Sequence, residues 1–127
     1  MNISDIEYRL KRLKEEDLIW LVYFFIVTFA IISNYYEKDY FITNNQISKE
    51  KYRNILIFIF SVALLVYTYF LYDSYKDYKN LSIYDNKKKK DFTKYSLIGS
   101  ILIFIAGSIF LYIAINDQDI EAELAFN

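Results

Sequence analysis

Three long apolar runs divide the chain. They cover residues 18–36, 55–72 and 97–115, each is 18 or 19 residues long, and none contains a charged residue. A helix rises 1.5 Å per residue, so it needs about 20 apolar residues to cross the hydrocarbon core of a bilayer. The runs are apolar on all sides rather than along one stripe. This pattern predicts an all-α integral membrane protein, in which three transmembrane helices form a small bundle and residues 1–127 make one membrane domain.

The segment before the first run, residues 1–17, has an amphipathic pattern. Ser4 and Glu7 have the spacing of a capping box, which predicts a helix start. Basic residues lie beside one narrow stripe of apolar residues. The apolar residues of the stripe are Ile3, Ile6, Leu10 and Leu13. Three interpretations fit this N-terminal helix: it lies among the lipid headgroups, it contacts a partner or a second copy, or it is a frayed tail. The first run begins late and ends without a small-residue cleavage site, so we expect a retained span and not a signal peptide.

The two connections differ in charge. Residues 37–54 are predicted as an outer loop, with a turn at residues 44–46 and Ser48 as the cap of the next helix. Residues 73–94 are predicted as a basic cytoplasmic connection, into which the helix of the second run continues. Tyr72, Tyr75 and Tyr78 follow one another at steps of three on this extension, which predicts packing on a neighbouring helix stem or, alternatively, a surface for a partner.

Small residues are concentrated in the third run. Both glycines of the chain lie there, and two sets of small residues repeat every seven positions: Gly99 and Ala106, and Ser100, Gly107 and Ala114. Small side chains let helix backbones approach closely in lipid. We therefore expect residues 97–115 to be the helix on which the other two pack, or a face for self-association.

The distribution of basic residues predicts the orientation. Residues 1–17 and 73–94 together carry eleven Lys and Arg, whereas residues 37–54 and the acidic tail, residues 116–127, together carry four. By the positive-inside rule, the N-terminus and residues 73–94 are cytoplasmic and the C-terminus lies outside, in a multi-pass protein of the cell membrane. Five lysines next to the third run are expected to contact anionic lipid headgroups: Lys87, Lys88, Lys89, Lys90 and Lys94.

Composition narrows the possible chemistry. The chain has no cysteine, histidine or proline, and its net charge is −1. Thiolate chemistry is therefore excluded, and the commonest general base and metal ligand is missing. Acidic residues alternate in the tail as at the start of an EF-hand loop, but Ala122 stands where the turn glycine belongs. We predict no metal, no cofactor, no nucleic-acid partner and no enzymatic activity, and a short amphipathic helix in the tail.

The absence of charge within the three runs also bears on function. Proton relays, voltage sensors and ion-coupled carriers need ionisable groups inside the membrane. The sequence favours an accessory or scaffold subunit that packs against another membrane protein or against itself. Two alternatives remain. The layout is similar to that of three-span phage holins, which self-assemble and permeabilise membranes, and a bacteriocin-immunity type of protein would shield a target within the membrane. The abundance of Ile, Lys, Asn, Tyr and Phe suggests a low-GC bacterial source.

Overall fold

The protein consists of three long helices joined by short connections. The computed structural model describes residues 2–121 and contains α1 (Ile3–Thr43), α2 (Gln46–Lys79) and α3 (Lys87–Asn116). Each helix is long and apolar enough to cross a membrane. The predicted all-helical architecture with three membrane-length helices is therefore confirmed, and it is the architecture of a multi-pass membrane protein.

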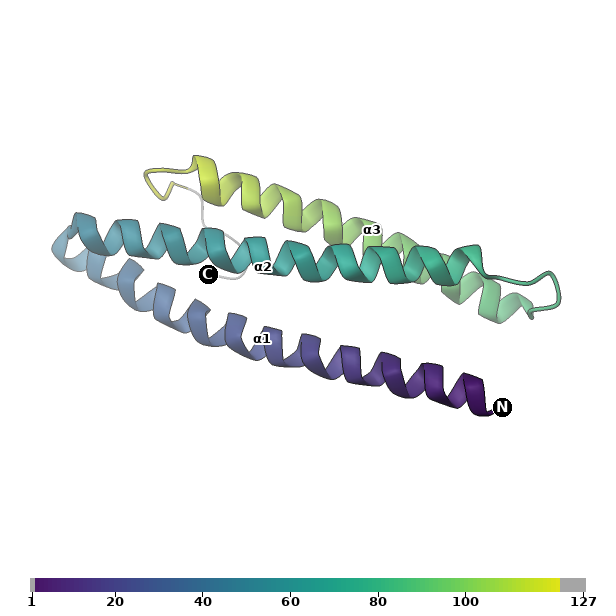
Figure 1. Cartoon of the computed structure of the whole chain (residues 1–127). Helices are drawn as coiled ribbons and strands as arrows, with labels where there is room; N and C mark the ends of the chain where they lie inside the picture. The colour runs from purple at the N-terminus through teal and green to yellow at the C-terminus, as the bar shows by residue number, and fades with distance from the viewer. Residues whose placement is uncertain (1, 122–127) are drawn as a thin grey trace.

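The middle helix of the sequence is also the middle helix of the structure. Both α1 and α3 pack against α2, and within residues 2–121 the backbones of α1 and α3 do not approach each other closely. Figure 1 shows α2 between its two neighbours, with α1 moving away from α2 towards the N-terminus. The expectation that the other two helices pack on residues 97–115 is wrong, because that position belongs to α2.

Burial follows this arrangement. In the most apolar 18-residue window of each helix, 28% of the residues are buried in α2, against 6% in α1 and 11% in α3. The buried apolar residues of α2 lie along one side of the helix, and they are Tyr52, Leu56, Ile59, Phe60, Ala63 and Val66. In α1 only Ser33 is buried, and its hydroxyl donates to the carbonyl oxygen of Ala30. Most of the apolar surface of the outer helices is therefore left for lipid or for another protein.

The N-terminal segment is not a separate helix. The helix α1 begins after Asn2, whose side-chain oxygen accepts from the backbone amide of Asp5, and it continues without a break through Leu18 into the first apolar run. Ser4, the predicted cap, instead donates its hydroxyl to the side chain of Asn2. Residues 3–17 therefore form a helical extension of the first apolar run, about 22 Å long at 1.5 Å per residue. The N-terminal segment and the first apolar run therefore belong to one continuous helix.

The first connection is much shorter than predicted. Helix α1 continues to Thr43 and α2 starts at Gln46, so only Asn44 and Asn45 join them. Asn44 adopts the left-handed conformation with φ of 56°, and Asn45 caps α2 in place of the predicted Ser48. Residues 37–43 and 46–54 are rich in charged and polar side chains, but they contain no proline or glycine to interrupt a helix.

Ser48 has a different role. It is buried, and its hydroxyl donates to the carboxylate of Asp39 on α1. This hydrogen bond connects α1 to α2 near the turn between them.

The second connection is also shorter than predicted. As predicted, α2 continues beyond the second apolar run, to Lys79, but α3 already begins at Lys87, so the loop covers only residues 80–86. Asn86 caps α3 by accepting from the backbone amide of Lys89. The carboxylate of Asp85 accepts from the backbone amide of Ser82 and pairs with Lys89. The hydrogen bond from the Ser82 amide, together with Lys89, lowers the pKa of Asp85 below its ordinary value.

The C-terminal end of α3 lies at the opposite end of the molecule (Figure 1). Helix α3 ends at Asn116, and residues 117–121 form a turn and not a helix. The remainder of the predicted tail helix lies outside the described residues. Arg53 donates to the carbonyl oxygen of Ile115, and Lys49 pairs with Asp119, so α2 is tied to the end of α3 at this side.

Candidate functional site: a charged cleft between the helix stems

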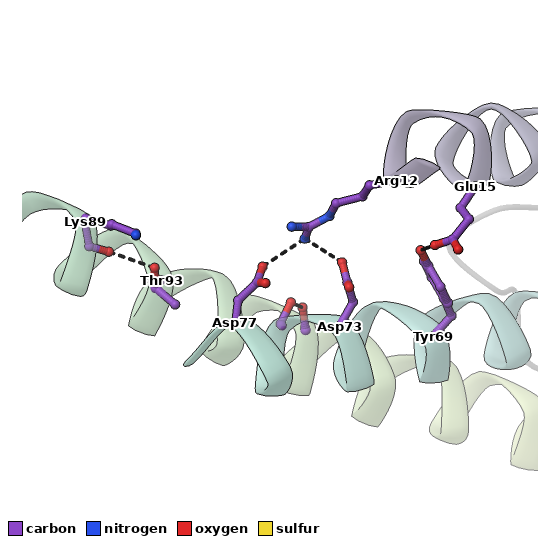
Figure 2. A network of polar contacts seen from close by, with 9 residues as sticks. Arg12, Glu15, Tyr69, Asp73, Asp77, Lys89 and Thr93 are labelled. Carbon is purple, nitrogen blue, oxygen red and sulfur yellow. Dashed lines mark hydrogen bonds and ion pairs between the residues drawn. The ribbon is translucent and has the colours of Figure 1, made fainter. Parts of the chain in front are cut away.

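A cluster of polar contacts joins the parts of α1 and α2 that extend beyond the apolar runs. Nη2 of Arg12 lies 2.5 Å from a carboxylate oxygen of Asp73 and 2.9 Å from one of Asp77 (Figure 2). The two carboxylates are four residues apart and therefore lie on the same face of α2. Partial burial lowers the pKa of Arg12, but the hydrogen bond to Asp77 and the charge of Asp73 raise it by more, so the net direction is upward. The guanidinium is a fixed positive charge that holds two negative charges together.

A second contact lies one turn earlier along α2, where Tyr69 belongs to the second apolar run itself. The phenol of Tyr69 donates to a carboxylate oxygen of Glu15 at 2.6 Å (Figure 2). Together with the Arg12 cluster, it connects α1 to α2 at two successive levels. The distance between the two helices increases from their turn towards the N-terminus of α1 (Figure 1).

The separation leaves an open cleft of about 890 Å³. All three helices and the second connection contribute to its walls, and most of the lining side chains are charged or polar. The lining residues are Asp5, Tyr8, Arg9, Arg12, Leu13, Glu16, Lys76, Asp77, Asn80, Leu81, Lys89 and Thr93. Basic and acidic side chains alternate on these walls, so the cleft has no strong charge of one sign.

Several charged groups in the cleft have no partner of their own. Arg12 is bound to the two aspartates and Lys89 to Asp85. In contrast, within residues 2–121, Lys76 and Glu16 form no ion pair and no side-chain hydrogen bond. Charged side chains of both signs are thus available to a ligand.

A smaller cavity of about 290 Å³ lies beside the cleft, between α2 and α3. It shares Asp77, Lys89 and Thr93 with the larger one, and it adds Ser74, Phe92 and Ser96. The hydroxyl of Thr93 donates to the carbonyl oxygen of Lys89 (Figure 2).

A buried hydroxyl pair connects α2 to α3 at this level. The hydroxyl oxygens of Ser74 and Ser100 lie 2.7 Å apart and share a hydrogen bond. Hydrogen bonds between helices hold membrane bundles together where the hydrophobic effect gives no driving force.

The predicted small residues of α3 divide into two groups. Ser100, Gly107 and Ala114 are the buried residues of α3 and face α2. A Cβ atom on Gly107 would lie 2.8 Å from Cδ2 of Tyr67, so this position has room for hydrogen only. Gly99 has open space where a Cβ would be, and Ala106 is exposed. The second set therefore takes no part in internal packing.

The predicted lipid-contact lysines also divide. Lys87, Lys88 and Lys94 are exposed, and Nζ of Lys88 lies 5.7 Å from the centre of the Phe92 ring. Lys89 pairs with Asp85, and Lys90 donates to the carbonyl oxygen of Ile83. Two of the five lysines are therefore engaged with the loop before α3.

The tyrosines of the α2 extension do not pack against a neighbouring stem. Tyr72, Tyr75 and Tyr78 are exposed, with 66%, 53% and 40% of their surface accessible. The packing interpretation is wrong, because both α1 and α3 contact other faces of α2.

Sequence reasoning missed the Arg12 cluster, although one signal was present. Arg12 lies six residues before the first apolar run, and Asp73 and Asp77 lie one and five residues after the second. Antiparallel helices that start and end at the same membrane surface bring such positions to similar heights. Opposite charges at matched distances from two successive runs are therefore a pattern that predicts an ion pair.

The cleft offers charged groups of both signs, among them Lys76 and Glu16. No group of three acidic, histidine or cysteine side chains within residues 2–121 is placed to hold a metal ion. The carboxylates of the cleft are either paired with Arg12 or open to solvent. The chain matches no family model, and no curated protein and no solved structure is significantly similar to it.

Proposed function

We propose that this protein is a small accessory or scaffold subunit of a larger membrane complex, which acts by helix packing and has no catalysis of its own. The observation that carries the proposal is the exposure of the two outer helices. Each packs on α2 along one side only, and large apolar side chains on their free sides are exposed, among them Trp20, Phe24, Phe25, Ile103 and Ile105. A chain built in this way has two free helix faces that remain available to other membrane helices.

The free side of α3 is suited to close packing. Gly99 has nothing within 4 Å of the position of a Cβ atom, and Ala106 is exposed on the same side of the helix. Gly99 and Ala106 are seven residues apart, so they lie on one face of α3. Small residues on an exposed face allow another helix to approach closely, and this approach supports a packing role.

The permeabilising alternative has less support. A pore needs polar groups that face its water, yet several hydroxyls within the spans are bonded inside the protein. Thr28, Thr68 and Ser108 donate to the carbonyl oxygens four residues earlier, at 2.8 to 3.0 Å. These three hydroxyls are therefore not available to line an aqueous path.

The orientation proposed from charge agrees with the arrangement of the ends. The start of α1 and the loop between α2 and α3 lie at the same end of the molecule, so the eleven basic residues share one side (Figure 1). We propose that this side is cytoplasmic in a bacterial cell membrane. The chain has no cysteine, so single cysteines report location cleanly. A membrane-impermeant maleimide added to intact cells should label Ile47→Cys and leave Tyr84→Cys unlabelled; the reverse pattern would show the opposite orientation.

The test of the accessory function is co-purification. The full chain with a small affinity tag is expressed at its native level, extracted in a mild detergent, and analysed by size and mass spectrometry. A different protein in stoichiometric amount is the expected result. The double variant Gly99→Leu with Ala106→Leu should lose that protein while keeping the melting temperature, because both positions face away from α2.

The matched control is Ile103→Leu, which changes an exposed apolar residue without adding volume and should keep the partner. A chain that purifies alone or only with copies of itself would refute the accessory function. In the second case, release of a cytoplasmic dye on expression would favour permeabilisation. Acquired resistance of a toxin-sensitive host would favour an immunity role.

A further inference from the structure

The charged cleft differs from the lysine run beside it. The exposed lysines Lys87 and Lys88 form a patch of one sign, which attracts anionic lipids without regard to their shape. The cleft instead combines Lys76 and Glu16, which have opposite charges and no partner within residues 2–121. A ligand that carries both charges matches such walls better than one that carries a single charge.

Arg12 adds a donor to the same cleft. Both of its contacts with the carboxylates of α2 use Nη2. The guanidinium has five N–H donors in a planar fork, so the Nη1 edge remains for a further acceptor. The aspartates fix the guanidinium in place, and a preorganised fork of this kind suits the oxygens of a phosphate.

The three groups lie within the layer of lipid headgroups or just beyond its outer edge. Glu16 is two residues before the first apolar run, Lys76 is four after the second, and Arg12 is six before the first. At 1.5 Å per residue these positions are about 3, 6 and 9 Å beyond the apolar spans. The polar layer on each side of the hydrocarbon core is about 5 to 8 Å thick. A phospholipid can therefore place its headgroup in the cleft while its chains stay in the membrane.

We infer that the cleft binds the headgroup of a zwitterionic phospholipid of the ethanolamine class. Its phosphate lies between Nζ of Lys76 and the Nη1 edge of Arg12, and its ammonium donates to the carboxylate of Glu16. The primary ammonium distinguishes ethanolamine from choline, because a quaternary ammonium has no N–H to donate and is usually recognised by several aromatic rings. Tyr8 is the aromatic residue among those that line the cleft.

Binding to the purified full chain tests this inference and needs no protein partner. Short-chain phosphatidylethanolamine, phosphatidylcholine and phosphatidylglycerol are each added to the detergent-solubilised protein, and retained lipid is measured by native mass spectrometry. Phosphatidylethanolamine should be retained at least about tenfold more tightly than phosphatidylcholine, which corresponds to one well-placed charged contact.

Variants of the cleft and of the lysine run provide matched controls. Lys76→Gln and Glu16→Gln each remove one unpaired charge, and each should weaken retention of phosphatidylethanolamine about tenfold. The double variant Lys87→Gln with Lys88→Gln should weaken phosphatidylglycerol retention and leave phosphatidylethanolamine unchanged. Melting temperatures of all variants should equal that of the unchanged protein, because none of these side chains packs in the interior.

Three results would overturn the inference. They are equal retention of ethanolamine and choline lipids, unchanged retention in both cleft variants, and binding of free phosphoethanolamine as tight as that of the lipid. The last result would assign the cleft to a soluble ligand. Because the measurement uses the isolated chain, its failure leaves the accessory function open, and failure of co-purification does not affect the lipid result.

Discussion

Replacing Gly107 with alanine should weaken the contact between α2 and α3, whereas the same change at Gly99 should not. A Cβ atom at Gly107 would lie 2.8 Å from Cδ2 and 3.1 Å from Cε2 of Tyr67, and 3.5 Å from Cδ1 of Leu64. The first distance is far below a normal carbon–carbon contact of about 3.5 to 4.0 Å. The tyrosine ring or the helix must therefore move. At Gly99 the new methyl group meets no atom within 4 Å.

The pair of variants separates two contributions to stability. Alanine is a better helix former than glycine by about 1 kcal/mol, and this gain is common to both positions because both lie inside α3. Overpacking of a closely packed site costs about 1 to 3 kcal/mol, and it applies to Gly107 alone. The free energy of unfolding of Gly107→Ala should therefore be lower than that of Gly99→Ala by about 1 to 3 kcal/mol.

The assay is equilibrium unfolding in mixed micelles. The protein in dodecyl maltoside is titrated with sodium dodecyl sulfate, and near-UV circular dichroism reports the packing of its aromatic side chains. Gly107→Leu extends the series, and we expect it to unfold at a still lower detergent fraction. Equal free energies of unfolding for the two alanine variants would refute the close approach of α3 to α2 at this position.

Three other contacts give further predictions. Arg12→Gln removes two charge-assisted contacts at partly exposed positions and should lower the free energy of unfolding by about 1–2 kcal/mol, with a smaller effect at high salt. The control Arg9→Gln breaks no ion pair and should change the free energy of unfolding by under about 0.5 kcal/mol. Equal effects of the two variants would show that the contacts of Arg12 with Asp73 and Asp77 do not stabilise the protein. In a double-mutant cycle, Ser74→Ala and Ser100→Ala should show a coupling of about 0.6 kcal/mol, as is typical between membrane helices, and strict additivity would contradict the shared hydrogen bond. Asn44 has a left-handed backbone conformation, which glycine adopts easily and valine does not. Asn44→Gly should therefore keep the melting temperature, and Asn44→Val should lower it by a clear margin. Identical melting curves for the two variants would contradict this turn geometry.

The local signals were sufficient for the elements but not for their ends. Hydropathy identified the three membrane-length helices, because a helix that can cross hydrocarbon requires a long uncharged run whatever its neighbours are. It did not show how far the first helix continues past its apolar run, since residues 37–43, which include charged side chains, carry the helix on to Thr43. Asparagines mark where the second and third helices begin, because Asn45 caps the N-terminus of α2 and Asn86 caps that of α3.

The sequence by itself determined that this is an all-helical chain with three membrane-length apolar helices, because that property depends on composition along a line. Only the tertiary structure decided that α2 is the central helix, that Ser100 and Gly107 are used inside the protein while Gly99 is not, and that Arg12 meets Asp73 and Asp77. Those outcomes depend on the rotation and relative height of each helix. Small shifts in either quantity bring different side chains face to face, and no residue pattern within a single helix fixes them.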